Sequence, residues 1–186
     1  SDVYKRQVPC RQDPCLYRGV LIEGQPPIHV GLYVDDFVYY SKSSEVESLF
    51  EAKLNELVDV EFMGTVQWFL GIQFQWDTLE DGRLRCHMSQ QAFTEAMFEK
   101  FNLLESVPSK SPYRSGYVID RIPHDGIPPE NKKDLVKTYQ SMLGCLIWLS
   151  INTRPDLAPV VKLLGQFNKN PLKGHLDAGK HSIRYL

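Results

Sequence analysis

Residues 28–40 read IHVGLYVDDFVYY, so two β-prone segments flank an adjacent acidic pair, Asp35 and Asp36. In the first segment, apolar residues recur at every second position, which is the period of a half-buried strand. In the second segment, residues 37–40 are again aromatic or β-branched. The pattern predicts a tight antiparallel hairpin whose two strands are joined at the acidic pair.

The acidic pair suggests a cation site. Adjacent carboxylates in an apolar setting repel each other and lose hydration, an arrangement tolerated mostly where a cation shares the site. Carboxylate oxygens suit Mg²⁺ in particular. The strand period places Tyr33 on the same face as Asp35 and turns Val34 toward the core. On the pair alone, a solvated turn is the simpler interpretation, because aspartate favours turns.

The segments around this hairpin extend the α+β pattern. Residues 20–22 are apolar and predict a first strand, and residues 24–27, GQPP, predict a turn. Residues 44–58 carry apolar side chains at helical spacing. Ser44 and Glu47 have the spacing of a capping box at the start of that helix.

A second hairpin and a short helix are predicted next. Residues 69–76 and 83–88 are apolar or β-prone and are separated by a glycine-containing turn. Ser89 can cap the helix that follows. One face of this helix is predicted to carry Phe93, Ala96, Met97, Phe101 and Leu104.

The last part of the chain is predicted to be helical after a proline-rich linker at residues 107–137. Thr153 and Asp156 are spaced as the ends of another capping box. His175 and His181 are six residues apart, so they do not form a ligand pair on one helical face, and both are expected at the surface. The helices are predicted to bury Tyr139, Met142, Leu143, Leu146 and Ile147, then Leu157, Val160, Val161 and Leu164.

Composition is that of a globular protein: 42% of the 186 residues are hydrophobic and 24% are charged. No apolar run reaches the roughly 18 residues that a membrane span needs. The net charge of −2 hides an uneven distribution. Residues 35–105 carry 5 basic and 14 acidic side chains, whereas residues 131–186 carry 9 basic and 3 acidic ones. A basic C-terminal third could contact phosphates, although a solvated helical surface explains it equally.

Several motifs together resemble the reverse transcriptases of copia-type LTR retrotransposons. Tyr33-Val34-Asp35-Asp36 resembles the family's YxDD motif, and residues 68–72, WFLGI, resemble its primer-grip segment. The resemblance continues in the same order through Met88-Ser89-Gln90, Tyr139 to Leu149, Thr153-Arg154-Pro155-Asp156 and Arg184-Tyr185-Leu186. It covers the chain from about residue 13 to its end.

This resemblance implies roles for individual residues. Asp35 and Asp36 would be catalytic carboxylates and ligands of Mg²⁺ or Mn²⁺, and Tyr33 would lie near the primer terminus. Trp68, Phe69, Leu70 and Gly71 would position the 3′ end of the primer. The implied partners are an RNA or DNA template–primer duplex, dNTPs and the rest of the Pol polyprotein (fingers, RNase H and integrase), with no membrane. The implied location is a cytoplasmic virus-like particle or the nucleus.

The family also implies a division of the chain. Residues 1–12 are an unplaced segment, of which 1–7 could be foreign to the native protein. Residues 13–88 would be the C-terminal part of an α+β polymerase palm, with antiparallel β-hairpins and a helix. Residues 89–186 would be the helical thumb and connection. A complete enzyme of this family has a further catalytic aspartate and fingers upstream, so we expect the isolated chain to be inactive.

Two other functions are compatible with parts of the sequence. A non-catalytic retroelement relic would at most bind nucleic acid, and primer extension that depends on Asp35 would exclude it. A receiver-like phosphoacceptor domain also has an acidic pair after a strand, and Asp77 lies at a suitable distance. That domain, however, needs strands and helices to alternate throughout, which the proline-rich segment at 107–137 does not allow.

Overall fold

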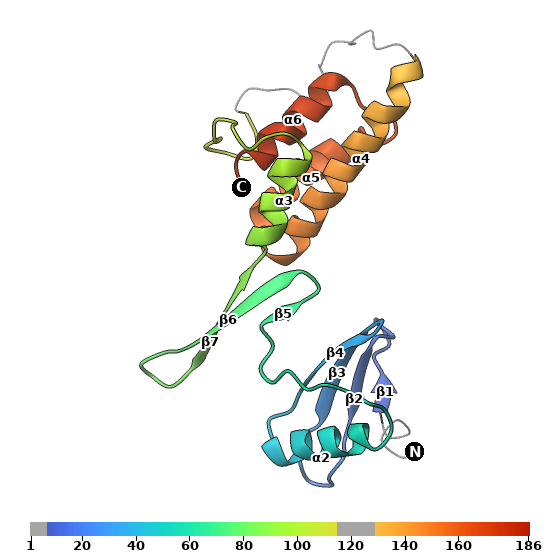
Figure 1. Ribbon diagram of the computed structural model, residues 1–186, viewed down its shortest axis with the longest axis vertical. Helices are drawn as coiled ribbons and strands as arrows, with labels where there is room; N and C mark the ends of the chain where they lie inside the picture. The colour runs from blue at the N-terminus through green and yellow to red at the C-terminus, as the bar shows by residue number, and fades with distance from the viewer. Residues whose placement is uncertain (1–6, 115–128) are drawn as a thin grey trace. The chain divides into compact units, whose positions relative to one another are not determined.

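The computed structural model describes residues 7–114 and 129–186, which form two compact units, 1–66 and 67–186 (Figure 1). The described residues form two antiparallel sheets and five α-helices, so the predicted α+β class is confirmed at that level. The assignment to a polymerase palm and thumb, and the boundaries drawn from it, stay predictions.

The first unit is a four-stranded antiparallel sheet with one helix. Its strands are β1 (Gln7–Pro9), β2 (Leu16–Gly19), β3 (Ile28–Tyr33) and β4 (Asp36–Tyr40), which pair in sequence order. Helix α2 (Ser44–Asn55) packs against one face of this sheet (Figure 1). The core of the unit consists of Ile28, Val30, Val46, Phe50 and Leu54.

Two details predicted for this unit are wrong. The strand that precedes β3 is β2, Leu16–Gly19, and not residues 20–22, because β2 has the register that pairs with β3. Helix α2 has no side-chain cap, and its N-cap residue is Ser43. Glu47 instead accepts a hydrogen bond of 2.8 Å from the backbone N–H of Ser41, which ties the end of the hairpin to the helix.

The second unit begins with the predicted hairpin. Its strands are β5 (Trp68–Phe69), β6 (Ile72–Thr78) and β7 (Leu84–Ser89), so one predicted strand is divided by a turn at Leu70 and Gly71. Both turn residues have positive φ, 51° and 74°, as a type I′ turn requires. The N-cap residue of α3 is Gln90 and no side chain caps this helix, so the predicted capping role of Ser89 is wrong; Ser89 ends β7 and accepts a hydrogen bond of 3.2 Å from the backbone N–H of Gln91.

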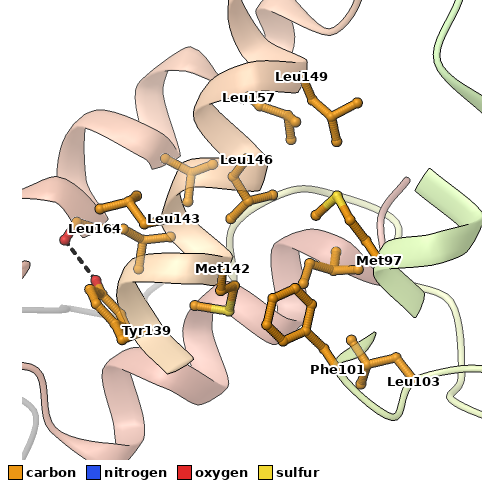
Figure 2. Packing of buried hydrophobic residues seen from close by; sticks show 12 residues of the cluster. Met97, Phe101, Leu103, Tyr139, Met142, Leu143, Leu146, Leu149, Leu157 and Leu164 are labelled. Atoms are coloured by element: carbon orange, nitrogen blue, oxygen red, sulfur yellow. Dashed lines mark hydrogen bonds between the residues drawn. The ribbon is translucent and has the colours of Figure 1, made fainter. Parts of the chain in front are cut away.

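Four helices and a short 3₁₀ helix complete the second unit. They are α3 (Gln91–Lys100), α4 (Pro129–Asn152), η2 (Pro155–Leu157), α5 (Ala158–Gly165) and α6 (Lys173–Ile183). Figure 2 shows the core between them, in which the Tyr139 hydroxyl donates a hydrogen bond of 2.6 Å to the Leu164 carbonyl. The buried residues are Met97, Phe101, Leu103, Tyr139, Met142, Leu143, Leu146, Leu149, Leu157, Val160, Leu164 and Ile183.

The core differs from the prediction where a helix ends earlier than its pattern suggests. Helix α3 ends at Lys100, so the helical spacing does not carry Leu104 into the core, where Leu103 lies instead. Ile147 is 41% exposed because it lies on the outer side of α4.

The predicted linker ends earlier than expected. Helix α4 begins at Pro129, within the predicted linker, and linker residues 115–128 lie outside the described residues.

Two predicted surface features are also different. Thr153 and Asp156 do not form a capping box, because Thr153 donates to the side chain of Gln90 and Asp156 pairs with Arg154. His175 is only 3% exposed. Its ring stacks on Phe167, and its Nδ1 atom accepts a hydrogen bond of 2.9 Å from the backbone of Leu172 at the start of α6. Burial of His175 is therefore structural.

None of the helices in residues 7–114 and 129–186 combines the length and the apolar character needed to cross a membrane.

Candidate functional site

The acidic pair lies at the tip of the β3–β4 hairpin. Tyr33 pairs with Asp36 in the register of the two strands, which leaves Val34 and Asp35 as a two-residue turn. Val34 has φ of 53°, in the left-handed region that β-branched residues strongly disfavour. Such a backbone conformation costs about 1–3 kcal/mol and is characteristic of functional sites. The turn is therefore strained at the residue between Tyr33 and Asp35.

The side chains of the turn face differently from the prediction. Val34 is 80% exposed and does not contribute to the core. The strand period ends at Tyr33, so it no longer determines where the side chains of the turn point. Cross-strand partners share a face of the sheet, which makes Asp36, and not Asp35, the neighbour of Tyr33 on that face.

Both carboxylates of the turn are exposed and without partners. Neither the Asp35 nor the Asp36 carboxylate forms a hydrogen bond or ion pair with the described residues. Two aspartates of the β6–β7 hairpin are paired instead: Asp81 pairs with Arg83 at 2.7 Å, and Asp77 pairs with Arg85 at 3.1 Å. The hydrogen bond from Arg83 also holds the pKa of Asp81 below its usual value. Asp35 and Asp36 thus lack a neighbouring arginine of the kind that pairs with Asp77 and with Asp81.

The pair has the chemistry of two ligands of a divalent metal ion. Two carboxylates bring the hard oxygen ligands that Mg²⁺ and Mn²⁺ prefer, and Mg²⁺ usually takes only one or two carboxylates along with water and substrate phosphates. Within the described ranges, 7–114 and 129–186, no three His, Cys, Asp or Glu side chains are grouped to hold a metal ion. Asp35 and Asp36 could therefore supply two ligands to such an ion, and its remaining ligands would have to be water, substrate phosphates or other residues.

The predicted primer-binding residues gather at a second turn. Trp68 is 55% exposed and Phe69 is half-buried, and the turn at Leu70 and Gly71 connects them to β6. Ile72, 6% exposed, anchors the start of that strand. A Cβ atom at Gly71 would meet no atom within 4 Å, so glycine is required there for its positive φ rather than for space.

The structure therefore forms two separate groups of predicted site residues. Tyr33, Asp35 and Asp36 come together in the first unit. Trp68, Phe69, Leu70 and Gly71 come together in the second unit. Each group is local in sequence, and each is assembled by one antiparallel hairpin.

A hollow of about 270 Å³ in the second unit was not predicted. It lies between α6 and residues 113–114, and Asp177, Lys180, His181 and Arg184 line its helical side. These four positions follow i, i+3, i+4 and i+7 spacing, which places them on one helical face. That spacing was visible in the sequence, but the segment across from it could be placed only by the tertiary fold.

Comparisons with known proteins identify relatives among transposons. The chain is 29% identical to the Retrovirus-related Pol polyprotein from transposon TNT 1-94 of Nicotiana tabacum, over 94% of this chain and 13% of that protein. It is 27% identical to the Putative transposon Ty5-1 protein YCL074W of Saccharomyces cerevisiae, over 86% of this chain and 49% of that one. It is 24% identical to the Uncharacterized mitochondrial protein AtMg00810 of Arabidopsis thaliana, over 83% and 59%.

The chain spans about an eighth to three fifths of the length of these relatives. No family model matches it, and no solved structure matches it. The similarity nevertheless runs through both compact units, because the alignment with the tobacco protein covers 94% of this chain.

Proposed function

We propose that this chain, a relative of the Pol polyproteins of copia-type retrotransposons, is part of an RNA-directed DNA polymerase whose chemistry is centred on Asp35 and Asp36. Similarity to transposon proteins over most of the chain supports the retroelement origin. The step from that origin to polymerase chemistry rests on the Tyr33–Asp36 hairpin.

One observation carries the proposal. A strained two-residue turn presents two adjacent carboxylates that have no partner among the described residues. A turn that served stability alone would gain from a residue such as glycine at position 34, and from a counter-charge beside the aspartates. Strain and unpaired charge in the same four residues favour a role in binding a cation.

The residues would divide the work as follows. Asp35 is proposed as the main carboxylate ligand of Mg²⁺ or Mn²⁺, and Asp36 as its assistant. When bound in the complete polymerase, the metal ions would activate the primer 3′ oxygen and stabilise charge on the leaving pyrophosphate. Tyr33 lies on the same sheet face as Asp36, so its ring could support the primer terminus. The exposed ring of Trp68 and the adjoining turn would hold the primer itself.

The partners follow from the same proposal. They would be a template–primer duplex of RNA or DNA, dNTPs, and the other parts of a Pol polyprotein. A cytoplasmic virus-like particle or the nucleus would be the place of action.

Primer extension tests the proposal. The Pol protein that carries this chain would be assayed on an RNA template with a DNA primer, as wild type, Asp35→Asn, Asp36→Asn and Asp81→Asn. Loss of a metal ligand removes several kcal/mol of transition-state stabilisation, so Asp35→Asn should lower extension by about 100-fold or more. Asp36→Asn should have a smaller effect. Asp81→Asn makes the same charge change in another exposed turn and should remain within about twofold of wild type.

The Asp81→Asn control distinguishes loss of a catalytic carboxylate from the loss of any one negative charge. Equal extension by Asp35→Asn and Asp81→Asn would refute the assignment of the turn. Wild-type protein that binds the template–primer duplex but never extends it would favour the non-catalytic relic instead.

A further inference from the structure

The hollow on α6 is rich in positive charge. Arg114 lies on one side, and Lys180 and Arg184 lie on the other. None of the three has an ion pair within the described residues, although Asp177 also lines the hollow and is exposed. With His181 neutral, the lining therefore carries three positive charges and one negative charge. A hollow with such an excess attracts anions.

The hydrogen bonds around His181 determine which of its nitrogens carries the proton. Its Nδ1 atom accepts a hydrogen bond of 3.3 Å from Nε of Arg114, and the hydroxyl of Ser109 lies 3.2 Å from the same atom. An arginine nitrogen can only donate, so Nδ1 is the unprotonated nitrogen and Nε2 carries the hydrogen. That Nε2–H group is buried and forms no hydrogen bond of good geometry with the described residues, although the backbone of Ser111 is close enough to the ring to affect its pKa.

A second donor in the hollow is also unsatisfied. The Nε atom of Arg184 is buried and has no partner among the described residues. Buried donors are rarely left unpaired in folded proteins, and an ion or water commonly satisfies those that seem to be. One of these two donors belongs to His181 and the other to Arg184, which is itself one of the three cations, and this combination favours an anion as the missing acceptor.

The environment of His181 agrees with this picture. Burial lowers the pKa of His181, and the charges of Arg114 and Arg184 lower it further, while the backbone of Ser111 has a small opposing effect. The imidazole is therefore neutral near pH 7 and serves as a donor through Nε2. An anion in the hollow would offset the two arginine charges and raise the pKa again.

We propose that this hollow binds a phosphate group. Four residues with hydrogen-bond donors, Arg114, Lys180, His181 and Arg184, line the hollow, and a phosphate has several oxygens that can accept from more than one of them. The two oxygens of a single carboxylate are suited to one bidentate arginine instead. The site lies within the second unit, does not involve Asp35 or Asp36, and is independent of the proposed polymerase function.

Histidine NMR on the whole chain tests the phosphate site. Addition of inorganic phosphate at constant ionic strength should raise the pKa of His181 by about half a unit or more. The NMR signals of the His87 ring, which lies beside Asp77 on the β6–β7 hairpin, should not respond to phosphate and provide an internal control. A His181 pKa that stays the same up to saturating phosphate would overturn the proposal.

Substitutions test whether phosphate binds in the hollow. Lys180 is partly exposed, so Lys180→Gln should preserve the fold while it weakens phosphate binding by about tenfold. Lys162→Gln removes the same charge from an exposed position on α5 and should change the affinity by less than about twofold. Equal effects of the two substitutions would mean that the chain attracts phosphate only through its general charge, and would refute the site.

The source of the phosphate can be distinguished with an RNA–DNA hybrid oligonucleotide. If the ligand is a backbone phosphate, the hybrid should raise the pKa of His181 and compete with inorganic phosphate. If the ligand is a free phosphate group, inorganic phosphate alone should produce the shift. In both cases inorganic phosphate must itself raise the pKa of His181, and the two sources differ only in whether the hybrid does so as well.

Discussion

The two compact units differ in how much core supports their candidate sites. In the first unit, five buried residues between one sheet face and α2 form the core. On the other sheet face, Leu16, Tyr33 and Tyr40 are each 47–58% exposed. In the second unit, five helical segments enclose a larger core that includes residues from α3, α4, η2, α5 and α6.

This difference matters because the strained turn belongs to the unit with the smaller core. Val34 has a left-handed backbone in the first unit, and a strain of about 1–3 kcal/mol is a large share of the stability of a small unit. The phosphate hollow instead lies on the larger unit. The comparison implies that the two candidate sites respond differently to loss of stability.

A matched pair of core substitutions should show the largest effects. Phe50→Ala in the first unit should cost about 3–5 kcal/mol, and Leu146→Ala in the second about 2–5 kcal/mol, because both side chains are almost completely buried. All three tryptophans, Trp68, Trp76 and Trp148, lie in the second unit, so their fluorescence reports on that unit alone. Urea unfolding followed by fluorescence measures the second unit, and the same unfolding followed by circular dichroism measures both units.

The expected result separates the units. Leu146→Ala should lower the midpoint of the fluorescence transition, and Phe50→Ala should lower only the circular dichroism transition. If Phe50→Ala shifted both transitions equally, the two units would unfold as one, and the comparison between them would fail.

Tyr139→Phe should have an intermediate effect that is confined to the second unit. It removes the donor to the Leu164 carbonyl in a buried position, which should cost about 1–2 kcal/mol. Burial also raises the pKa of Tyr139 in the folded protein. The unfolded chain therefore ionises first, and stability falls as the pH rises above about 10. Fluorescence-detected unfolding between pH 8 and 11 measures this loss.

The substitution should reduce that alkaline loss, because phenylalanine does not ionise. A second unit whose stability falls equally with pH in wild type and in Tyr139→Phe would contradict the role assigned to this hydroxyl.

Val34→Gly should have the smallest effect, and it should be stabilising. Glycine adopts positive φ without the steric cost that valine bears, so the first unit should gain about 1 kcal/mol despite the greater flexibility of the unfolded chain. Circular dichroism should detect the gain, with the tryptophan transition unchanged. A loss of stability would show that Val34 makes favourable contacts that outweigh its strain.

The sequence predicted the hairpins because their signals are local. Alternation in residues 28–40 depends only on neighbouring positions, and the observed strands β3 and β4 follow it closely. Strand β2 was misplaced because residues 16–19, LYRG, are less apolar than residues 20–22, and only pairing with β3 identifies them. Pairing between strands depends on the fold and not on composition.

For the candidate site, the sequence predicted which residues belong to it but not how exposed they are. The residues of both turns could be named from their motifs, but the exposure of Val34 depends on where β3 ends. Burial of His175 depends on stacking with Phe167 and on the turn before α6, neither of which has a periodic signature. The phosphate hollow needs Arg114 and α6 to meet across 63 to 70 residues of sequence, which only the tertiary structure provides.

The rate of a single nucleotide addition tests the central assignment most directly. With the Pol protein bound to a template–primer duplex in excess, a rapid-quench assay measures the chemical step separately from binding. We predict that Asp35→Asn binds the duplex normally and adds the nucleotide at least about 100-fold more slowly than wild type. An unchanged rate in Asp35→Asn would contradict the assignment of the Tyr33–Asp36 turn as the catalytic centre.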